Sequence, residues 1–268
     1  MRKISFILCV IYTMNAFSHG DLHLRIEKLK ARISTELKKS DEVLQLAELY
    51  CLDKNWKLSE KYFFLAKKIT PLDLNYQIGL ANMYYQNKKY IKAKEQIDQF
   101  LEKSVALRYN AFLLKARISK SLRSFELAEN YYNQAIEKMD NFNPDVFQEK
   151  LEVQKKLNKD LVVVQKYLES AIEKYNDISL KFMEIEYNTL KHDWKKALSR
   201  MDQVIAESNR KELYYFKKAK ILELNSDFKL AIENYGLAKK EIDKLPERLK
   251  QNIDVKNLEK EINLKLNK

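Results

Sequence analysis

The chain has 268 residues, of which 46% are hydrophobic and 33% are charged, so it can bury a large core beneath a charged surface. It contains only three glycines and three prolines, which argues against a sheet built on tight turns and against a loop-rich active site. The formal net charge of +12 is compatible with polyanion binding, but lysine pairs are scattered along the chain with acidic residues nearby, as on solvated helix faces. These properties favour a nearly all-helical protein.

Residues 1–18 have the features of a secretory signal peptide. Two basic residues precede an apolar run of eleven residues at 4–14, and small residues at 16 and 18 mark a cleavage site. That run is too short to cross a bilayer as a helix, which takes about 20 residues. We predict cleavage after Ser18, a periplasmic or secreted location, and a mature net charge of 12 − 2 = +10.

The mature chain would keep one cysteine, Cys51, because Cys9 lies inside the apolar run. No intramolecular disulfide could then form, even in an oxidising compartment. The residues before Cys9 also lack the small side chains of a bacterial lipoprotein signal, so lipid anchoring is not expected. Packing alone must stabilise the fold.

Residues 19–39 are predicted to form a leading helix. Its apolar residues are spaced by four, three, four and four positions, which places them on one helical face: Leu22, Ile26, Leu29, Ile33 and Leu37.

A repeat of about 34 residues then occupies residues 40–245. Bulky residues that follow short polar turns are separated by 34, 35, 36, 33 and 34 residues: Trp56, Tyr90, Phe125, Leu161, Trp194 and Phe228. Three positions further stand Ser59, Ala93, Ala128, Val164, Ala197 and Ala231, and later aromatic or aliphatic and small residues complete one helical face. A mostly small residue at this position lets two helices approach closely.

A second helical stripe precedes each turn, clearest in Leu46-Ala47 with Tyr50. Every unit is therefore predicted to be a helix, a polar turn and a helix, and the six units start near Ser40, Leu74, Tyr109, Asp145, Ile178 and Glu212. Residues 246–268 are predicted to form a closing helix that starts at Pro246, with a stripe of Val255, Leu258, Ile262 and Leu266.

The pattern resembles the tetratricopeptide repeat (TPR) family. The first unit fits best, with Leu46, Ala47, Tyr50, Ser59, Phe63, Ala66 and Pro71 at the family positions. The resemblance implies an all-α, right-handed α-solenoid of about six hairpins with a leading and a closing helix. The fourth unit departs from the pattern, with Glu152 and Lys155 where Ala and Tyr are expected, and the fifth has Ile185 and Asn188 there, so both are predicted to pack less regularly.

In TPR proteins the first helices of successive hairpins line a concave groove that holds peptides. Carried onto this sequence, the resemblance gives eight groove positions in units two and three: Asn75, Ile78, Asn82, Tyr85, Asn110, Leu113, Arg117 and Lys120. Asparagines can pair with peptide amides, the two cations can meet carboxylates, and the apolar residues can serve as anchors. We therefore expect a scaffold or adaptor that binds a partner protein or an extended peptide with an acidic group.

Other functions have weaker support in the sequence. No phosphate-binding glycine loop, nucleophile elbow or cysteine pair is present, so no catalytic residue and no cofactor are predicted, and no specific nucleic acid is expected. Two alternatives stay open: a basic surface that binds a polyanion, and metal handling through His19 and His23 near Asp21 at the mature N-terminus. His192 is predicted to be a polar turn residue. The sequence does not predict an oligomeric state.

Overall fold

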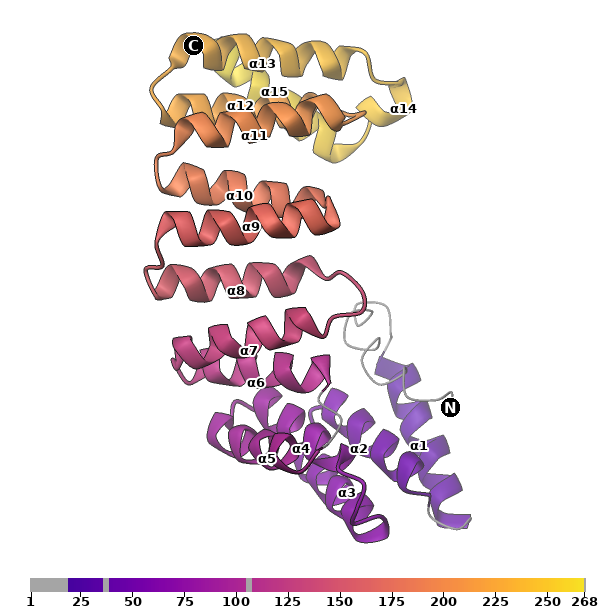
Figure 1. Cartoon of the computed structure of the whole chain (residues 1–268). Helices are drawn as coiled ribbons and strands as arrows, with labels where there is room; N and C mark the ends of the chain where they lie inside the picture. Colours follow the sequence, from indigo (N-terminus) through magenta and orange to yellow (C-terminus); the bar gives the residue numbers. More distant parts are fainter. Residues whose placement is uncertain (1–18, 36–38, 105–107, 268) are drawn as a thin grey trace. The chain divides into compact units, whose positions relative to one another are not determined.

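The computed structural model describes residues 19–35, 39–104 and 108–267, and within these ranges every regular element is an α-helix. The predicted signal peptide at 1–18 lies outside them. The chain divides into two compact units, Met1–Leu157 and Asn158–Lys268. In each, successive helices run antiparallel and stack in layers (Figure 1). No described helix combines the length and the apolar character needed to cross a membrane.

The first unit contains the leading helix and three complete hairpins, followed by the first helix of the fourth. Its helices are α1 (His19–Thr35), α2 (Ser40–Leu52), α3 (Trp56–Ile69), α4 (Asn75–Gln86), α5 (Tyr90–Lys103), α6 (Tyr109–Ser121), α7 (Phe125–Glu137) and α8 (Pro144–Lys156). Within α1, Ile26, Leu29 and Ile33 are buried and pack with the core of the first two repeats, which confirms the leading helix.

The second unit begins with the second helix of the fourth repeat and continues to the C-terminus. Its helices are α9 (Leu161–Tyr175), α10 (Ile178–Leu190), α11 (Trp194–Glu207), α12 (Glu212–Leu224), α13 (Phe228–Asp243), α14 (Glu247–Lys250) and α15 (Ile253–Leu266). The prediction of one uninterrupted closing helix from Pro246 was wrong. Pro246 is the N-cap of the short α14, and the closing helix α15 starts after a second N-cap at Asn252. Val255 and Ile262 of α15 are buried as predicted.

The small position of the second helices is where the hairpins close. Ala93, Ala128 and Ala197 are fully buried, and Ala231 is 1% exposed. In the first repeat the same place holds Ser59, whose hydroxyl donates a 2.8 Å hydrogen bond to the carbonyl of Ala47 on the facing helix. The recurring small residues thus permit close helix contacts, as the repeat predicted.

The polar turns share one backbone conformation. The middle residue of each turn has a positive φ: Lys54, Lys88, Arg123, Asn158, His192 and Ser226. In five of these described turns the next N–H donates to the carbonyl five residues back, as from Asn55 to Tyr50 at 2.8 Å, which satisfies a helix-end carbonyl. His192 is therefore a turn residue, as predicted.

The fourth repeat required a correction of register. In the other repeats, the residue seven positions before the positive-φ residue is buried and occupies the Ala position of the first helix, as Ala47 does before Lys54. In the fourth repeat that residue is Leu151, which is fully buried, whereas Glu152 is exposed. The predicted assignment of Glu152 and Lys155 was one residue too late, because this turn holds one extra residue before its second helix. The boundary between the two compact units falls in the same turn.

Candidate binding site on α4, α6 and α8

The eight predicted groove positions occupy equivalent places on α4 and α6, the neighbouring first helices of repeats two and three. Within each helix they are spaced by three, four and three residues, so they lie along one face. Seven of the eight are half-buried in the structure. The exception is Leu113, which is 4% exposed and packs in the core with Phe112 and Ala116. Leu113 was wrongly predicted as an apolar anchor, because a leucine at this position completes the helix contact instead of facing solvent.

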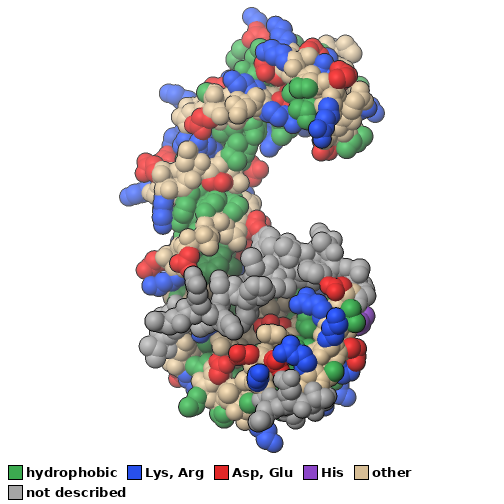
Figure 2. Space-filling view, turned by 90° about the vertical axis from the view of Figure 1, so that its right-hand side faces the viewer, with side chains coloured by type: hydrophobic (Ala, Val, Ile, Leu, Met, Phe, Trp, Pro, Cys, Tyr) green, Lys and Arg blue, Asp and Glu red, His purple; other side chains and the backbone are tan. Residues whose placement is uncertain are grey.

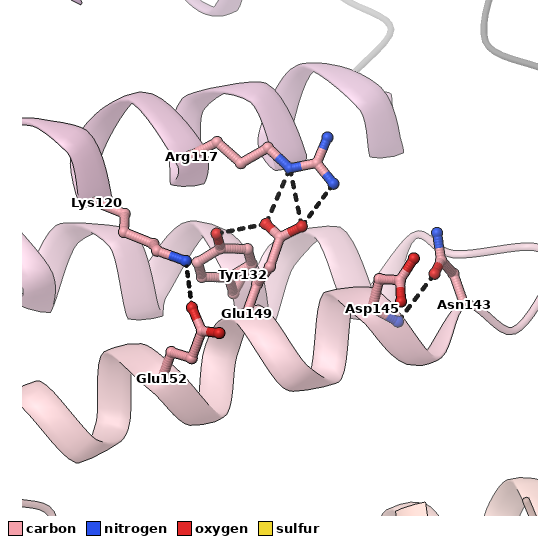
Figure 3. Close-up of polar contacts among 7 residues, drawn as sticks. All are labelled: Arg117, Lys120, Tyr132, Asn143, Asp145, Glu149 and Glu152. Atoms are coloured by element: carbon pink, nitrogen blue, oxygen red, sulfur yellow. Dashed lines mark hydrogen bonds and ion pairs between the residues drawn. The ribbon is translucent and has the colours of Figure 1, made fainter. Parts of the chain in front are cut away.

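Arg117 forms a forked ion pair with Glu149 of α8, the first helix of the next repeat (Figure 3). Its Nη2 lies 2.7 Å from Oε1, and its Nε lies 2.9 Å from Oε2. The Tyr132 hydroxyl of α7 also donates to Oε2, at 2.8 Å. Burial would raise the pKa of the Glu149 carboxyl, but the bonds and charge of Arg117 outweigh burial and hold this pKa below its ordinary value. Glu149 is therefore ionised at neutral pH.

Lys120 makes the parallel contact one helical turn further along. Its Nζ donates to Glu152 Oε2 at 2.6 Å, and both side chains are more exposed than the Arg117–Glu149 pair. Each acid stands 32 residues after its cation, so the two pairs repeat the same geometry. Both cations predicted for a ligand carboxylate are thus already balanced by carboxylates of the chain itself.

Donors nevertheless remain on both cations. A guanidinium has five N–H groups, and Arg117 bonds Glu149 through Nε and Nη2, which leaves Nη1 for another acceptor. A lysine ammonium has three, of which Lys120 gives one to Glu152. The two cations can therefore donate to a carbonyl or carboxylate oxygen of a ligand while their ion pairs stay intact.

The asparagines of this face differ in their availability. The side-chain oxygen of Asn75 accepts a 2.9 Å hydrogen bond from Arg108, so one half of this amide is engaged. The side chains of Asn82 and Asn110 make no hydrogen bond with any residue that the structure describes. Each offers an acceptor and two donors, which is what the backbone of an extended peptide requires.

A hollow of about 410 Å³ opens beside the ion pairs. It is lined by Tyr85, Arg117, Lys120, Ser121, Glu149 and Glu152. Tyr85 supplies an aromatic wall, and its ring packs at a tilt against Tyr90 with centroids 5.8 Å apart. The hollow thus presents two cations, two carboxylates and an aromatic face to a ligand.

Sequence reasoning missed the acidic half of this site. Glu149 and Glu152 were not assigned to the groove, because unit four was read in the wrong register and Glu152 was placed at a packing position. Their constant 32-residue distance from the two cations was visible in the sequence. Tyr132 belongs to the repeating packing face of the second helices, where it is fully buried, and its hydroxyl also orients Glu149.

The metal-handling alternative finds no cluster of ligands in the described part of the chain. His23 Nε2 lies 3.8 Å from Asp53 Oδ1, and no group of three or more His, Cys, Asp or Glu residues comes together there; the His19 side chain is outside the description. Acidic and basic side chains lie interspersed on the face drawn in Figure 2, in keeping with the scattered lysine pairs of the sequence.

No protein-family model and no curated protein matches the sequence, whereas many solved structures resemble the fold. The C-terminal part of a TPR repeat-containing protein from Cytophaga hutchinsonii matches with a TM-score of 0.60 and 15% identity, over 83% of this chain and 93% of its own. PilF of Pseudomonas aeruginosa matches at 0.52 and 14%, over 83% and 97%. A chain of the APC/C hetero-tetramer Cut9–Hcn1 matches at 0.50 and 13%, over 91% of this chain and 46% of its own. Identities this low establish the fold alone: the chain has the tetratricopeptide-repeat fold, an all-α solenoid of helical hairpins.

Proposed function

We propose that this protein is an exported scaffold that binds a partner protein through an extended segment laid across α4, α6 and α8. The observation that carries the proposal is the face itself, where two unbonded amides, an aromatic wall and two balanced ion pairs with spare donors lie on consecutive repeats. A peptide needs this combination, because its amides require partners wherever they leave water. Proteins with this fold also occur in assemblies, as in the Cut9–Hcn1 hetero-tetramer.

An acidic group on the partner segment fits the spare donors of Arg117 and Lys120. The attraction is smaller than two free cations would give, since Glu149 and Glu152 cancel most of the charge. Backbone hydrogen bonding therefore contributes most of the affinity, and the acidic group sets the register of the bound segment. Export rests on the predicted signal peptide, and it places the partner in the periplasm or outside the cell.

The test removes the two unbonded amides. The variant Asn82→Ala, Asn110→Ala leaves every described ion pair intact, so its fold should be that of the parent. Loss of two hydrogen bonds costs about 1–3 kcal/mol net, which lowers the affinity for the partner about 5- to 150-fold. The control is Asn133→Ala, Asn141→Ala, which changes two exposed asparagines elsewhere in the same unit.

Tagged mature protein would be used to recover partners from an envelope extract of the native host. The parent and the control should recover the same proteins, and the groove variant should lose at least one of them. A groove variant that is folded by circular dichroism and recovers every partner of the parent would show that the peptide does not lie on this face.

A further inference from the structure

A second hollow, of about 650 Å³, lies at the turns of the first two repeats and shares no residue with the hollow beside Arg117. It is formed by the two hairpin turns together with the start of α3 and the end of α4. Its lining comprises Asp53, Lys54, Asn55, Trp56, Lys57, Glu60, Met83, Tyr84, Asn87 and Lys89. Its volume is in the range of small-molecule sites, roughly 300–1,000 Å³.

The basic and acidic residues of this hollow differ in their contacts. Lys54, Lys57 and Lys89 are exposed, and none of them has an ion pair or a side-chain hydrogen bond with the residues that the structure describes. The two acids of the lining have contacts: the Glu60 carboxylate accepts a hydrogen bond from the Tyr84 hydroxyl, and the Asp53 carboxylate lies 3.8 Å from His23. The lining therefore includes three lysines whose ammonium groups form no ion pair with a described carboxylate.

An aromatic side chain completes the lining. Trp56 is half-buried, because it packs partly against the core of the first repeats, and it also borders the hollow. An indole ring held in this way offers a flat apolar surface at little conformational cost. Ammonium groups attract anionic oxygens, so ring and lysines together suit a ligand with a planar body and an anionic group.

All three lysines occur together only at the first pair of turns. In the register of the next repeat, the places of Lys57 and Lys89 are taken by Ile91 and Ser124. One repeat further, Glu126 stands at the first of these places. Single cations recur at these places in later repeats, as Lys88 and Arg123 at the place of Lys54 and Lys195 at that of Lys57. Only the first pair of turns combines three lysines with an indole ring.

We propose that the turn hollow of repeats one and two binds a small organic anion that carries a planar ring. The lysines hold the anionic group and Trp56 stacks on the ring. This site is separate from the peptide groove, and it adds a ligand-binding function to the scaffold.

Tryptophan fluorescence tests the proposal directly. Trp56 and Trp194 are the two tryptophans of the chain, so Trp194→Phe leaves the hollow's own indole as the sole reporter. Adenosine triphosphate serves as a probe with both a planar ring and an anionic group, and inorganic triphosphate and adenosine serve as its two halves. Adenosine triphosphate should quench the emission saturably and bind at least tenfold more tightly than either half.

Charge reversal at the site is compared with charge reversal beside it. In the Trp194→Phe protein, the double change Lys57→Glu, Lys89→Glu should lower the affinity for adenosine triphosphate at least tenfold. Lys61→Glu, Lys68→Glu changes the net charge equally at exposed positions of α3 outside the hollow, and it should leave the affinity within about twofold. The proposal is overturned if the two double variants lose affinity equally, since attraction to net charge would then suffice. It is also overturned if the parent shows no saturable quenching.

Discussion

Gly79 offers the sharpest test of how the repeats pack. It lies in the middle of α4, where glycine is a poor helix former, and a β-carbon placed on it would stand 2.1 Å from Cε1 and 2.6 Å from Cζ of Phe63. Phe63 is 1% exposed, so its ring cannot swing into solvent. The missing side chain at residue 79 is therefore what allows the ring of the preceding repeat to reach α4.

The variant Gly79→Ala should destabilise the first unit. Overpacking a core typically costs about 1–3 kcal/mol, and so severe an overlap belongs at the upper end. The gain in helix propensity, about 1 kcal/mol, offsets part of this cost, which leaves a net loss of about 2 kcal/mol. The matched control is Gly236→Ala in α13, where an added β-carbon meets no atom within 4 Å. That change should stabilise the second unit by up to about 1 kcal/mol.

Urea unfolding followed by fluorescence separates the two effects, because Trp56 lies in the first unit and Trp194 in the second. With Trp56 as the only reporter, Gly79→Ala should lower the transition midpoint. With Trp194 as the only reporter, Gly236→Ala should raise it. A Gly79→Ala protein as stable as its parent would refute the packing of Phe63 against α4, and so would a loss that Phe63→Leu fails to relieve.

Three further predictions concern other parts of the chain. Ala128→Leu overpacks a fully buried helix contact and should cost about 1–3 kcal/mol in urea unfolding, whereas Ala206→Leu at an exposed site should change little; equal effects would contradict the repeat register. Burial raises the pKa of Glu48 from 4.5 to about 7, so the folded state binds this proton more tightly and stability should fall as pH rises between these values, by at most about 3 kcal/mol. Glu48→Gln should remove that fall and be more stable than the parent at about pH 8, and an unchanged pH dependence in urea unfolding would exclude the burial of the carboxyl. Terminal sequencing of the protein from its native host should find a chain that starts after Ser18, and a retained Met1 would contradict export.

The periodic part of the fold was predictable because its causes are local. A small residue such as Ala93 or Ala128 recurs where two helices touch, and the spacing alone assigns it to the buried face. The turn of the fourth repeat was misread because one extra residue changes the register of α8 without changing the apolar character of Leu151 or its neighbours. Only the buried state of Leu151 settles which residue faces the core.

The site was predictable in position but not in charge. The repeat step placed Asn82, Arg117 and Lys120 on one face, and the structure agrees. Whether a cation there is free depends on side chains of the next repeat. Glu149 on α8 pairs with Arg117 on α6, although the two residues are 32 positions apart in the sequence. The pattern within one helix contains no information on such a pair. Only the 32-residue spacing between repeats links the two acids to the two cations, and the structure shows that the four side chains meet.

The central claim, that a partner segment lies across α4 and α6, is tested most directly by site-specific photo-crosslinking in the native host. A photoreactive amino acid would replace Asn82, Asn110 or, as the control on α7, Asn133. The account predicts crosslinked species of higher mass at residues 82 and 110 and none at 133. Crosslinks at residue 133 with none at the two groove positions would contradict it, and so would their absence from all three.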